Sequence, residues 1–191
     1  EPDKLSLEAI LDNRILTLRN PQILSIFRVQ HTILAAFADH LRGEGFTEIK
    51  TSKLIGTGTE GGTGLFAVEY FDGKVYLTQS PQLYKQTMVA AGLERVFEIG
   101  PAYRAEKHDT PRHINEFVSL DVEIAWVESE QDLMDLETRI LAAVFRRVRE
   151  SNAADLAAWK AEVPDPEAAA RIPRVSHDEA REIVAKETGR K

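Results

Sequence analysis

The stretch Phe97–Trp126, FEIGPAYRAEKHDTPRHINEFVSLDVEIAW, decides how the rest of the sequence is interpreted. Two runs with apolar residues at many alternate positions, Arg95–Tyr103 and Glu116–Trp126, enclose a long polar segment. Such alternation is typical of half-buried strands. The enclosed segment carries more charge than a hairpin needs for solubility, and loops on rigid scaffolds are where binding groups collect. The stretch therefore predicts an antiparallel hairpin whose loop binds an anion.

The composition is that of a globular protein, with 191 residues of which 43% are apolar. This length suits one domain, or one domain with part of another. The net charge of −7 by itself argues against a nucleic-acid binder, although an acidic protein can carry local basic contacts. No apolar run approaches the roughly 20 residues of a membrane span, so no membrane partner is expected. Because the sequence has no cysteine, disulfides and thiolate metal sites are excluded and a cytoplasmic protein is expected.

A long amphipathic helix is predicted to begin at Asn20-Pro21, since Asn can cap free amide groups and Pro fits the first helical position. Apolar residues then recur at steps of three to four as far as Leu41. Gly43 and Gly45 supply the end of the helix, and a strand over Phe46–Lys50 follows. Periodicity alone is equally compatible with an ordinary helix packed on its own sheet and with a helix in an interface.

The next segment, Ile55–Gly64, is the glycine-rich stretch IGTGTEGGTG. It lacks the lysine and the spacing of a P-loop, so a flexible connection is the default interpretation. Beyond it, Leu65–Phe71 and Lys74–Thr78 read as strands joined by the turn Asp72-Gly73, a strong hairpin signature.

A further helix is predicted to open at Ser80-Pro81 and to end at Gly92. Gln82 and Lys85 stand at positions i and i+3 and therefore share one face of it. By burial statistics alone, a lysine on a helix is solvated far more often than buried.

The C-terminal third predicts two helices separated by a variable connection. Ser129–Ser151 is strongly periodic, and Ser129 can cap it. Residues 152–171 read as a connection or a short helix. A capping box at Ser176–Glu179 then opens a final helix, with Gly189 near its close.

Several motifs together resemble a known family. Motif 2 of the class II aminoacyl-tRNA synthetases is similar to three pieces of this sequence, Tyr103–Glu106, Arg112–His113 and Asn115–Phe117. Two further pieces, QSPQLYKQ at Gln79–Gln86 and TEGG at Thr59–Gly62, narrow the resemblance to aspartyl-tRNA synthetases of the archaeal and eukaryotic type.

The resemblance implies an α+β fold, a class II antiparallel sheet flanked by helices, incomplete, with the active site on the face of the sheet. It implies three regions: an entry segment or linker at 1–20, a catalytic core with motifs 1 and 2 at 21–151, and a variable connection with the start of an inserted helical region at 152–191. Motif 1 corresponds to residues 21–50 and implies a homodimer through that region. Thr51-Ser52 departs from the Thr-Pro that the family usually has there. No third motif is matched, which favours a fragment of a longer enzyme.

The implied activity is that of an aspartate–tRNA ligase. Such an enzyme uses ATP to activate L-aspartate as aspartyl-adenylate and transfers it to tRNA, either to the aspartate tRNA alone or also to the asparagine tRNA. Mg²⁺ is expected on the ATP phosphates, with its carboxylate ligands in a part that this sequence lacks. The alternatives are an asparaginyl-tRNA synthetase or an asparagine synthetase-like paralogue and, from a different class, a non-catalytic binding module.

The resemblance also implies roles for individual residues. Arg104 is the expected catalytic residue, because a guanidinium beside both reactants lowers the repulsion between an attacking carboxylate and a polyphosphate. The expected ATP-binding residues are Arg104, Glu106, Arg112, His113, Ile114 and Phe117. The expected amino-acid-binding residues are Glu60, Gln82, Lys85, Arg104 and Glu123.

Lys85 decides the expected substrate. A buried ammonium without a partner is costly, and the β-carboxylate of aspartate would satisfy it where neutral asparagine would not. Aspartate is therefore preferred to asparagine. His108 and His113 have no third clear ligand in their loop, so no protein metal site is expected.

Overall fold

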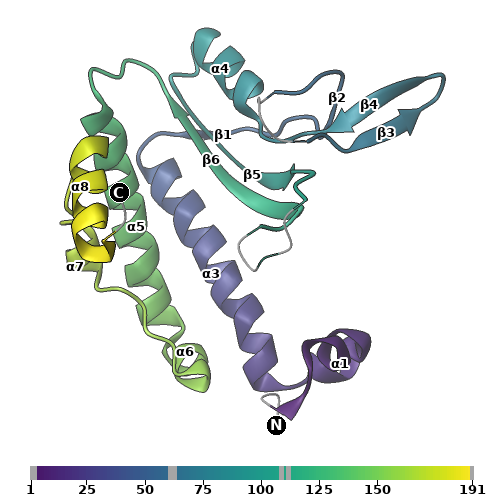
Figure 1. The fold of residues 1–191 in the computed structure, drawn as a ribbon, viewed down its shortest axis with the longest axis vertical. Helices are drawn as coiled ribbons and strands as arrows, with labels where there is room; N and C mark the ends of the chain where they lie inside the picture. Colours follow the sequence, from purple (N-terminus) through teal and green to yellow (C-terminus); the bar gives the residue numbers. More distant parts are fainter. Residues whose placement is uncertain (1–3, 60–63, 108–109, 111–112, 190–191) are drawn as a thin grey trace. The chain divides into compact units, whose positions relative to one another are not determined.

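The structure, a computed structural model, describes residues 4–59, 64–107, 110 and 113–189. The chain forms two compact units (Figure 1). The sheet unit is Gln30–Leu133, and the helical unit combines Glu1–Val29 with Met134–Lys191. The expected division of the chain into 1–20, 21–151 and 152–191 stays a prediction.

Among its described residues, the sheet unit contains two three-stranded sheets (Figure 1). The first has the order β1-β5-β6, in which β5 runs parallel to β1 and antiparallel to β6. The second, β2-β4-β3, is antiparallel throughout. The strands are β1 Thr47–Glu48, β2 Leu54–Ile55, β3 Ala67–Tyr70, β4 Gly73–Leu77, β5 Arg95–Tyr103 and β6 Glu116–Ile124.

The predicted central hairpin is confirmed. Strands β5 and β6 pair along their whole length, from Arg95 opposite Ile124 to Tyr103 opposite Glu116. Strand β6 ends at Ile124 rather than at Trp126, because Trp126 leaves the extended region with a φ of 59° and is 84% exposed.

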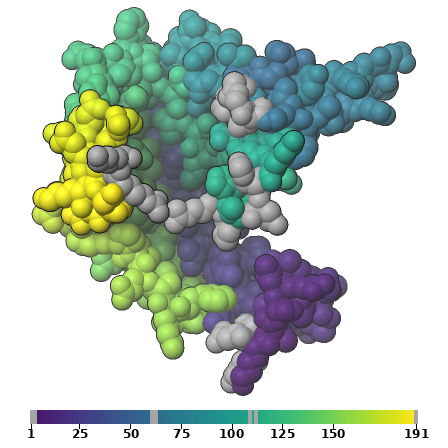
Figure 2. Space-filling model, in the orientation of Figure 1, coloured from purple at the N-terminus to yellow at the C-terminus, as the bar shows by residue number. Residues whose placement is uncertain are grey.

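The second predicted hairpin is also present, but its turn lies one residue earlier than expected. Tyr70 pairs with Gly73, so the turn residues are Phe71 and Asp72. Phe71 has a φ of 50°, a backbone conformation that residues other than glycine rarely adopt. Its ring packs edge-on against the ring of Tyr70, with 4.7 Å between the centroids. The hairpin stands out from the rest of the sheet unit in the space-filling view (Figure 2).

Helix α3 covers Pro21–Gly43, as the capping signals predict. The side chain of Asn20 accepts a hydrogen bond from the amide of Gln22 at 2.9 Å, and Gly45 beyond the end has a φ of 82°. Within the sheet unit, α3 packs on β5 through an edge-on contact between Phe37 and Phe97, with 6.0 Å between ring centroids. Leu41, Val96 and Phe97 are fully buried there and form the centre of the core.

Three further helices were predicted and are present, whereas residues 7–17, expected as an entry segment, and residues 153–169, expected as a connection or a short helix, form two short helices each. Glu130–Ser151 (α5) matches the predicted periodic segment, and α4 covers Gln82–Ala90. The capping box of α8 is confirmed, since Ser176 and Glu179 each accept a hydrogen bond from the other's amide. The other helices are α1 Leu7–Asp12, α2 Arg14–Thr17, α6 Ala153–Trp159, α7 Pro166–Ala169 and α8 His177–Thr188. Among the described residues, no helix is both long enough and apolar enough to cross a membrane.

Candidate active site

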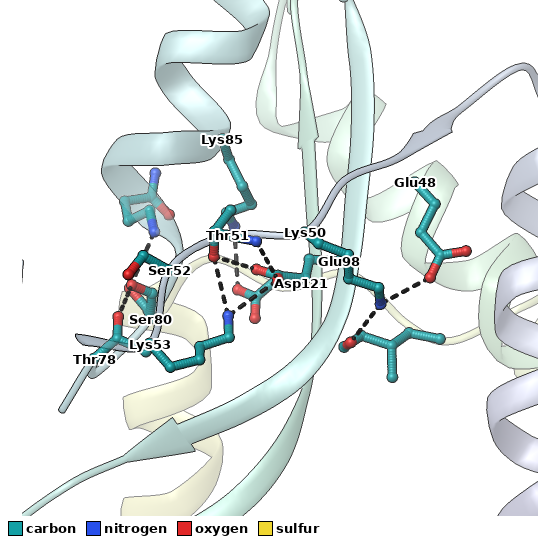
Figure 3. Close-up of polar contacts among 12 residues, drawn as sticks. Glu48, Lys50, Thr51, Ser52, Lys53, Thr78, Ser80, Lys85, Glu98 and Asp121 are labelled. Carbon is teal, nitrogen blue, oxygen red and sulfur yellow. Dashed lines mark hydrogen bonds and ion pairs between the residues drawn. The ribbon is translucent and has the colours of Figure 1, made fainter. Parts of the chain in front are cut away.

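Lys85 lies on α4 with only 4% of its surface exposed. Its ammonium is 3.1 Å from a carboxylate oxygen of Asp121 and 3.5 Å from one of Glu123, and it donates to the backbone carbonyl of Val122 at 3.3 Å. Figure 3 shows Lys85 reaching from α4 toward Asp121. The motif in which Lys85 stands therefore gives the better guide to its burial than lysine statistics. The lysine has two carboxylate neighbours on β6, of which Asp121 was not among the expected site residues.

Gln82 and Glu123 belong to the same group of side chains, and we call Gln82, Lys85, Asp121 and Glu123 the lysine cluster. The side-chain amide of Gln82 donates to the carboxylate of Glu123 at 3.3 Å. Since Gln82 and Lys85 share one face of α4, both reach the same strand. Three of the expected amino-acid-binding residues, Gln82, Lys85 and Glu123, are thus in contact with one another or with shared partners.

Arg104 stands directly after β5. Its amide donates to the carbonyl of Asn115 at 2.9 Å, which continues the β5–β6 ladder by one more bond. Its guanidinium carbon lies 5.5 Å from the centre of the Phe117 ring. An arginine over an aromatic face is held by a cation–π attraction. The pair places a cation and an aromatic ring side by side at one end of β6.

Asn115 holds the neck of the loop. With its side-chain amide oriented by the hydrogen-bond network, the nitrogen donates to the carbonyls of Arg104 at 3.0 Å and Glu106 at 3.2 Å. The amide of Glu106 in turn donates to the carbonyl of Arg104 at 2.8 Å. One side chain thereby fixes the backbone of two expected ATP-binding residues.

The lysine cluster and the arginine–aromatic pair share one face of β6. Side chains on a strand alternate between faces, so Phe117, Asp121 and Glu123 point the same way. Phe117 contacts Arg104, while Asp121 and Glu123 contact Lys85. Asp121 lies four positions after Phe117, a distance of about 13 Å along a strand. Arg104 and Lys85 therefore lie over the same face of β6, and the residues that they contact are about 13 Å apart along the strand.

The remaining expected residues are less central or lie outside the description. His113 is exposed, and its Nδ1 is 2.6 Å from the hydroxyl of Thr110. Ile114 is 57% exposed. Glu60 and Arg112, together with His108, lie outside the residues that the structure describes.

The glycine-rich stretch ends against the residue that follows Arg104. Ala105 donates its amide hydrogen to the carbonyl of Gly64 at 3.1 Å. A Cβ on Gly64 would lie 2.7 Å from the carbonyl oxygen of Ala105, closer than real Cβ contacts come. The backbone therefore requires glycine at this point, and the end of the stretch is fixed beside Arg104.

Burial and a hydrogen bond to Glu116 raise the pKa of Tyr103, the last residue of β5. Of the residues that sequence reasoning missed, Asp121 had a usable signal, because it alternates with Phe117 and Glu123 on a predicted strand. Within the described ranges, no group of three or more His, Asp or Glu side chains is arranged to hold a metal ion.

Comparisons with known proteins agree with this arrangement. The family model described as tRNA synthetases class II (D, K and N) matches residues 6–190. An aspartate–tRNA(Asp) ligase of Pyrococcus abyssi is 47% identical over 182 residues, 95% of this chain and 41% of that protein. An aspartate–tRNA(Asp/Asn) ligase of Deinococcus radiodurans is also 47% identical over 182 residues, again 95% of this chain and 41% of that protein. The chain thus spans less than half the length of these curated relatives.

Solved structures give the same picture. An asparaginyl-tRNA synthetase from Pyrococcus horikoshii, complexed with asparaginyl-adenylate, superimposes with a TM-score of 0.91 at 33% identity, covering 98% of this chain and 43% of that one. A putative aspartyl-tRNA synthetase from Leishmania major Friedlin gives a TM-score of 0.74 at 35% identity, covering 81% of this chain and 29% of that one. With an α+β fold, the motifs in family order and a family match along nearly its whole length, this chain belongs to the class II tRNA synthetases of the D, K and N family.

Proposed function

We propose that this chain carries the aspartate-activating face of an aspartate–tRNA ligase. The observation that supports it is the shared face of β6, with a buried lysine at one end and an arginine–aromatic pair at the other. Curated relatives at 47% identity are named aspartate–tRNA ligases. The enzyme would join L-aspartate and ATP into aspartyl-adenylate and then pass the aspartyl group to tRNA.

In this proposal the side chain of aspartate binds at the Lys85 end. The β-carboxylate would share the ammonium that Asp121 and Glu123 hold at 3.1 and 3.5 Å. An ammonium already fixed in position costs little to orient when the substrate arrives. Gln82 and Glu123, which are hydrogen-bonded to each other, would border the substrate's ammonium group together with Glu60.

The reacting groups would then meet near Arg104. A carboxylate oxygen of aspartate attacks the α-phosphorus of ATP, the bond to the β-phosphate breaks, and pyrophosphate leaves. Negative charge gathers on the phosphoryl oxygens as this happens, and a fixed guanidinium stabilises it. The protein transfers no proton in this step, so positioning and electrostatics carry the rate.

ATP would enter with Mg²⁺ on its phosphates, the form in which Mg²⁺ commonly meets nucleotides. Phe117 offers an aromatic face on which adenine can stack, and by the family motif Glu106 would contact the adenine amino group. Arg112 and His113 would lie near the distal phosphates or the reacting carboxylate, and Ile114 would also contact ATP. These assignments follow from the family motif, and each is open to substitution experiments.

The choice of amino acid rests on Lys85. Contrary to the expectation from sequence, the ammonium of Lys85 is not unpaired, because Asp121, Glu123 and the Val122 carbonyl already contact it. We propose that the β-carboxylate of aspartate replaces one of these contacts, for which the neutral amide of asparagine would be the weaker substitute. The competing candidate is an asparaginyl-tRNA synthetase, favoured by the TM-score of 0.91 to a structure of that name. The relatives include ligases named both for tRNA(Asp) and for tRNA(Asp/Asn), so we propose tRNA as the second substrate without choosing between them. We further propose a homodimer through residues 21–50 and, from the cysteine-free sequence, a cytoplasmic location.

The test is the exchange of pyrophosphate into ATP in the presence of aspartate. Lys85→Ala should lower this exchange at least about thirtyfold, since it leaves two carboxylates facing the substrate without their cation. ATP binding should be retained, because Arg104 and Phe117 are untouched, and this also checks that the variant folds. Lys74→Ala, at an exposed lysine of β4, is the matched control and should leave the exchange unchanged.

Undiminished aspartate activation in Lys85→Ala would refute the assignment of Lys85. Exchange that depends on asparagine and not on aspartate would favour the asparaginyl enzyme. Because the chain spans 41% of the length of its relatives, a lack of exchange with either amino acid would favour a binding module only when it is measured on a protein of their full length.

A further inference from the structure

Beside the lysine cluster lies a buried carboxylate that the proposed reaction does not use. Glu98, on β5, is 1% exposed. One of its oxygens accepts from the amide of Thr51 at 2.9 Å and pairs with the ammonium of Lys53 at 3.0 Å. The other accepts from the Thr51 hydroxyl at 2.7 Å, and Lys53 also donates to that hydroxyl at 3.0 Å. We call Thr51, Lys53 and Glu98 the joint cluster (Figure 3).

The joint cluster sits where the chain passes from one sheet to the other. Residues 49–53, which include Thr51 and Lys53, connect β1 of the first sheet to β2 of the second. The carbonyl of Lys53 accepts from the amide of Thr78 at 3.1 Å, and the carbonyl of Thr78 accepts from the amide of Tyr103 at 2.9 Å. Thr78 leads into α4, which carries Lys85, and Tyr103 precedes Arg104. The cluster therefore fixes the backbone from which one side of the candidate site starts.

Ser52, which stands where the family usually has proline, keeps the backbone connection between the two sheets in place. Its hydroxyl donates to the carbonyl of Leu54 at 2.7 Å, which closes a local turn. The side chain of Ser52 thus holds the turn, while the residues on either side of Ser52, Thr51 and Lys53, bind Glu98.

The joint cluster also faces the lysine cluster directly. Glu98 and Asp121 are opposite each other in the β5–β6 register. Residues in opposite positions point to the same face, and like charges placed there destabilise a sheet. Each carboxylate has its own lysine, Lys53 for Glu98 and Lys85 for Asp121. Since Glu123 also lies 3.5 Å from the ammonium of Lys85, the two lysines offset Glu98 and Asp121 and leave one further carboxylate on this face.

Gly100 gives Lys53 the room for this arrangement. A Cβ at Gly100 would lie 3.3 Å from both Cε and Nζ of Lys53, and 3.4 Å from a carboxylate oxygen of Glu98. These are tight contacts, so the absence of a side chain at Gly100 allows Lys53 to lie across β5. The second ion pair is thus fitted to the surface of the strand on which it rests.

We propose that Lys53 and Glu98, with Thr51, are positioning residues for the amino-acid end of the site. Lys53 neutralises Glu98, so that Asp121 opposite it can hold Lys85 at the distance that a substrate carboxylate needs. Without Lys53, the buried Glu98 charge would add to that of Asp121, hold Lys85 more tightly and repel an anionic substrate. The part of this inference that concerns aspartate rests on the proposed function, whereas the part that concerns the backbone of the joint does not.

The first experiment needs no ligand. Amide hydrogen exchange is compared in the unaltered protein, Lys53→Met, Glu98→Gln and the double variant. Both single variants should speed exchange at the amides of Thr51 and Thr78 about tenfold relative to the amides of β5, because each leaves a charge of the pair without its partner. The double variant, in which both charges are gone, should return to within about threefold of the unaltered protein. Glu48→Gln, which removes a similar paired glutamate from β1 outside the joint, is the matched control and should change neither amide.

The second experiment measures the affinities of the same proteins for L-aspartate and for ATP. An unbalanced charge roughly 10 Å from the substrate is worth about tenfold in affinity, so Lys53→Met should weaken aspartate binding by about that factor. The double variant should regain most of it. ATP affinity should fall by less than aspartate affinity in every variant, because Arg104 and Phe117 lie about 13 Å from Asp121 along β6. General loosening of the fold would weaken both ligands together.

Unchanged exchange at Thr51 and Thr78 in both single variants would overturn the inference. So would a double variant no better than the singles, or an equal loss of aspartate and ATP affinity. If the unaltered protein binds no L-aspartate, the proposed function fails, and the exchange measurements with rescue by the double variant still decide whether the joint cluster fixes this backbone.

Discussion

At the scale of single residues, the close approach of a neighbouring backbone explains why position 64 is a glycine. A Cβ there would meet the carbonyl oxygen of Ala105 at 2.7 Å. Gly64→Ala should therefore destabilise the protein by about 1–3 kcal/mol, as overpacking does. At most positions the same change stabilises slightly, because it restricts the unfolded chain. Urea unfolding measures the difference in free energy.

Gly56→Ala is the control for this prediction. It lies in the same glycine-rich stretch, and nothing stands within 4 Å of a Cβ placed there. Its free energy of unfolding should be unchanged or slightly higher. Equal effects of the two substitutions would mean that the contact with Ala105 is not what requires glycine at position 64.

The burial of a single residue was predictable from sequence where the residue stands in a recognisable short motif. The place of Lys85 within QSPQLYK indicated a buried role, and the structure buries it. Its partners Asp121 and Glu123 come from a strand distant in sequence, and only the β5–β6 register brings them to α4. The same limit hid Glu98, whose partners Thr51 and Lys53 belong to a segment between two sheets. Spacing along the chain does not reveal which strand a polar side chain will face.

At the scale of elements, α6 is tied to the first turns of α3 within the helical unit. The Arg28 guanidinium pairs with the carboxylate of Asp155, which also accepts from Asn152 at 2.9 Å. Trp159 donates to the carbonyl of Gln22 at 2.8 Å. The hydrogen bond from Arg28, followed by that from Asn152, lowers the pKa of Asp155 below its usual value.

This pKa shift predicts a dependence of stability on acid. Because the folded-state pKa lies below that of the unfolded chain, the Asp155 carboxylate stabilises above pH about 3.9. The contribution is lost as the pH falls through the folded-state pKa. Asp155→Asn should lower the melting temperature by several degrees at pH 7. Its difference from the unaltered protein should shrink steadily between pH 5 and pH 3.

Asp72→Asn, at the exposed turn of the β3–β4 hairpin, serves as the control and should differ little at any pH. A deficit for Asp155→Asn that stays constant down to pH 3 would show that the ion pair with Arg28 does not stabilise the helical unit.

Elements with strong local signals were predicted best. The caps at Asn20 and Ser176 set the starts of α3 and α8, as the sequence predicts. The strand predicted over Phe46–Lys50 shortens to Thr47–Glu48, because Thr51 turns its amide to the carboxylate of Glu98 instead of to a neighbouring strand. Such a side chain–backbone bond leaves no periodic trace in a sequence.

At the scale of the whole molecule, the chain covers 41% of the length of its curated relatives and bears exposed apolar residues on α3. Leu24, Ile26 and Phe27 are 40%, 50% and 39% exposed, within the region proposed to form the homodimer. A charge buried unpaired in an interface is costly. Ile26→Asp should therefore raise the dissociation constant of the dimer at least about tenfold, measured by sedimentation velocity over a range of protein concentrations.

Ile183→Asp supplies the matched control for that measurement. Ile183 lies on α8 and is 51% exposed, so the substitution makes the same chemical change at the same exposure outside residues 21–50. It should leave the dimer unaffected if the interface lies where proposed. If the dimer withstands Ile26→Asp but dissociates with Ile183→Asp, the interface lies on the C-terminal helices. If the unaltered protein sediments as a monomer at every concentration, self-association of this chain is refuted.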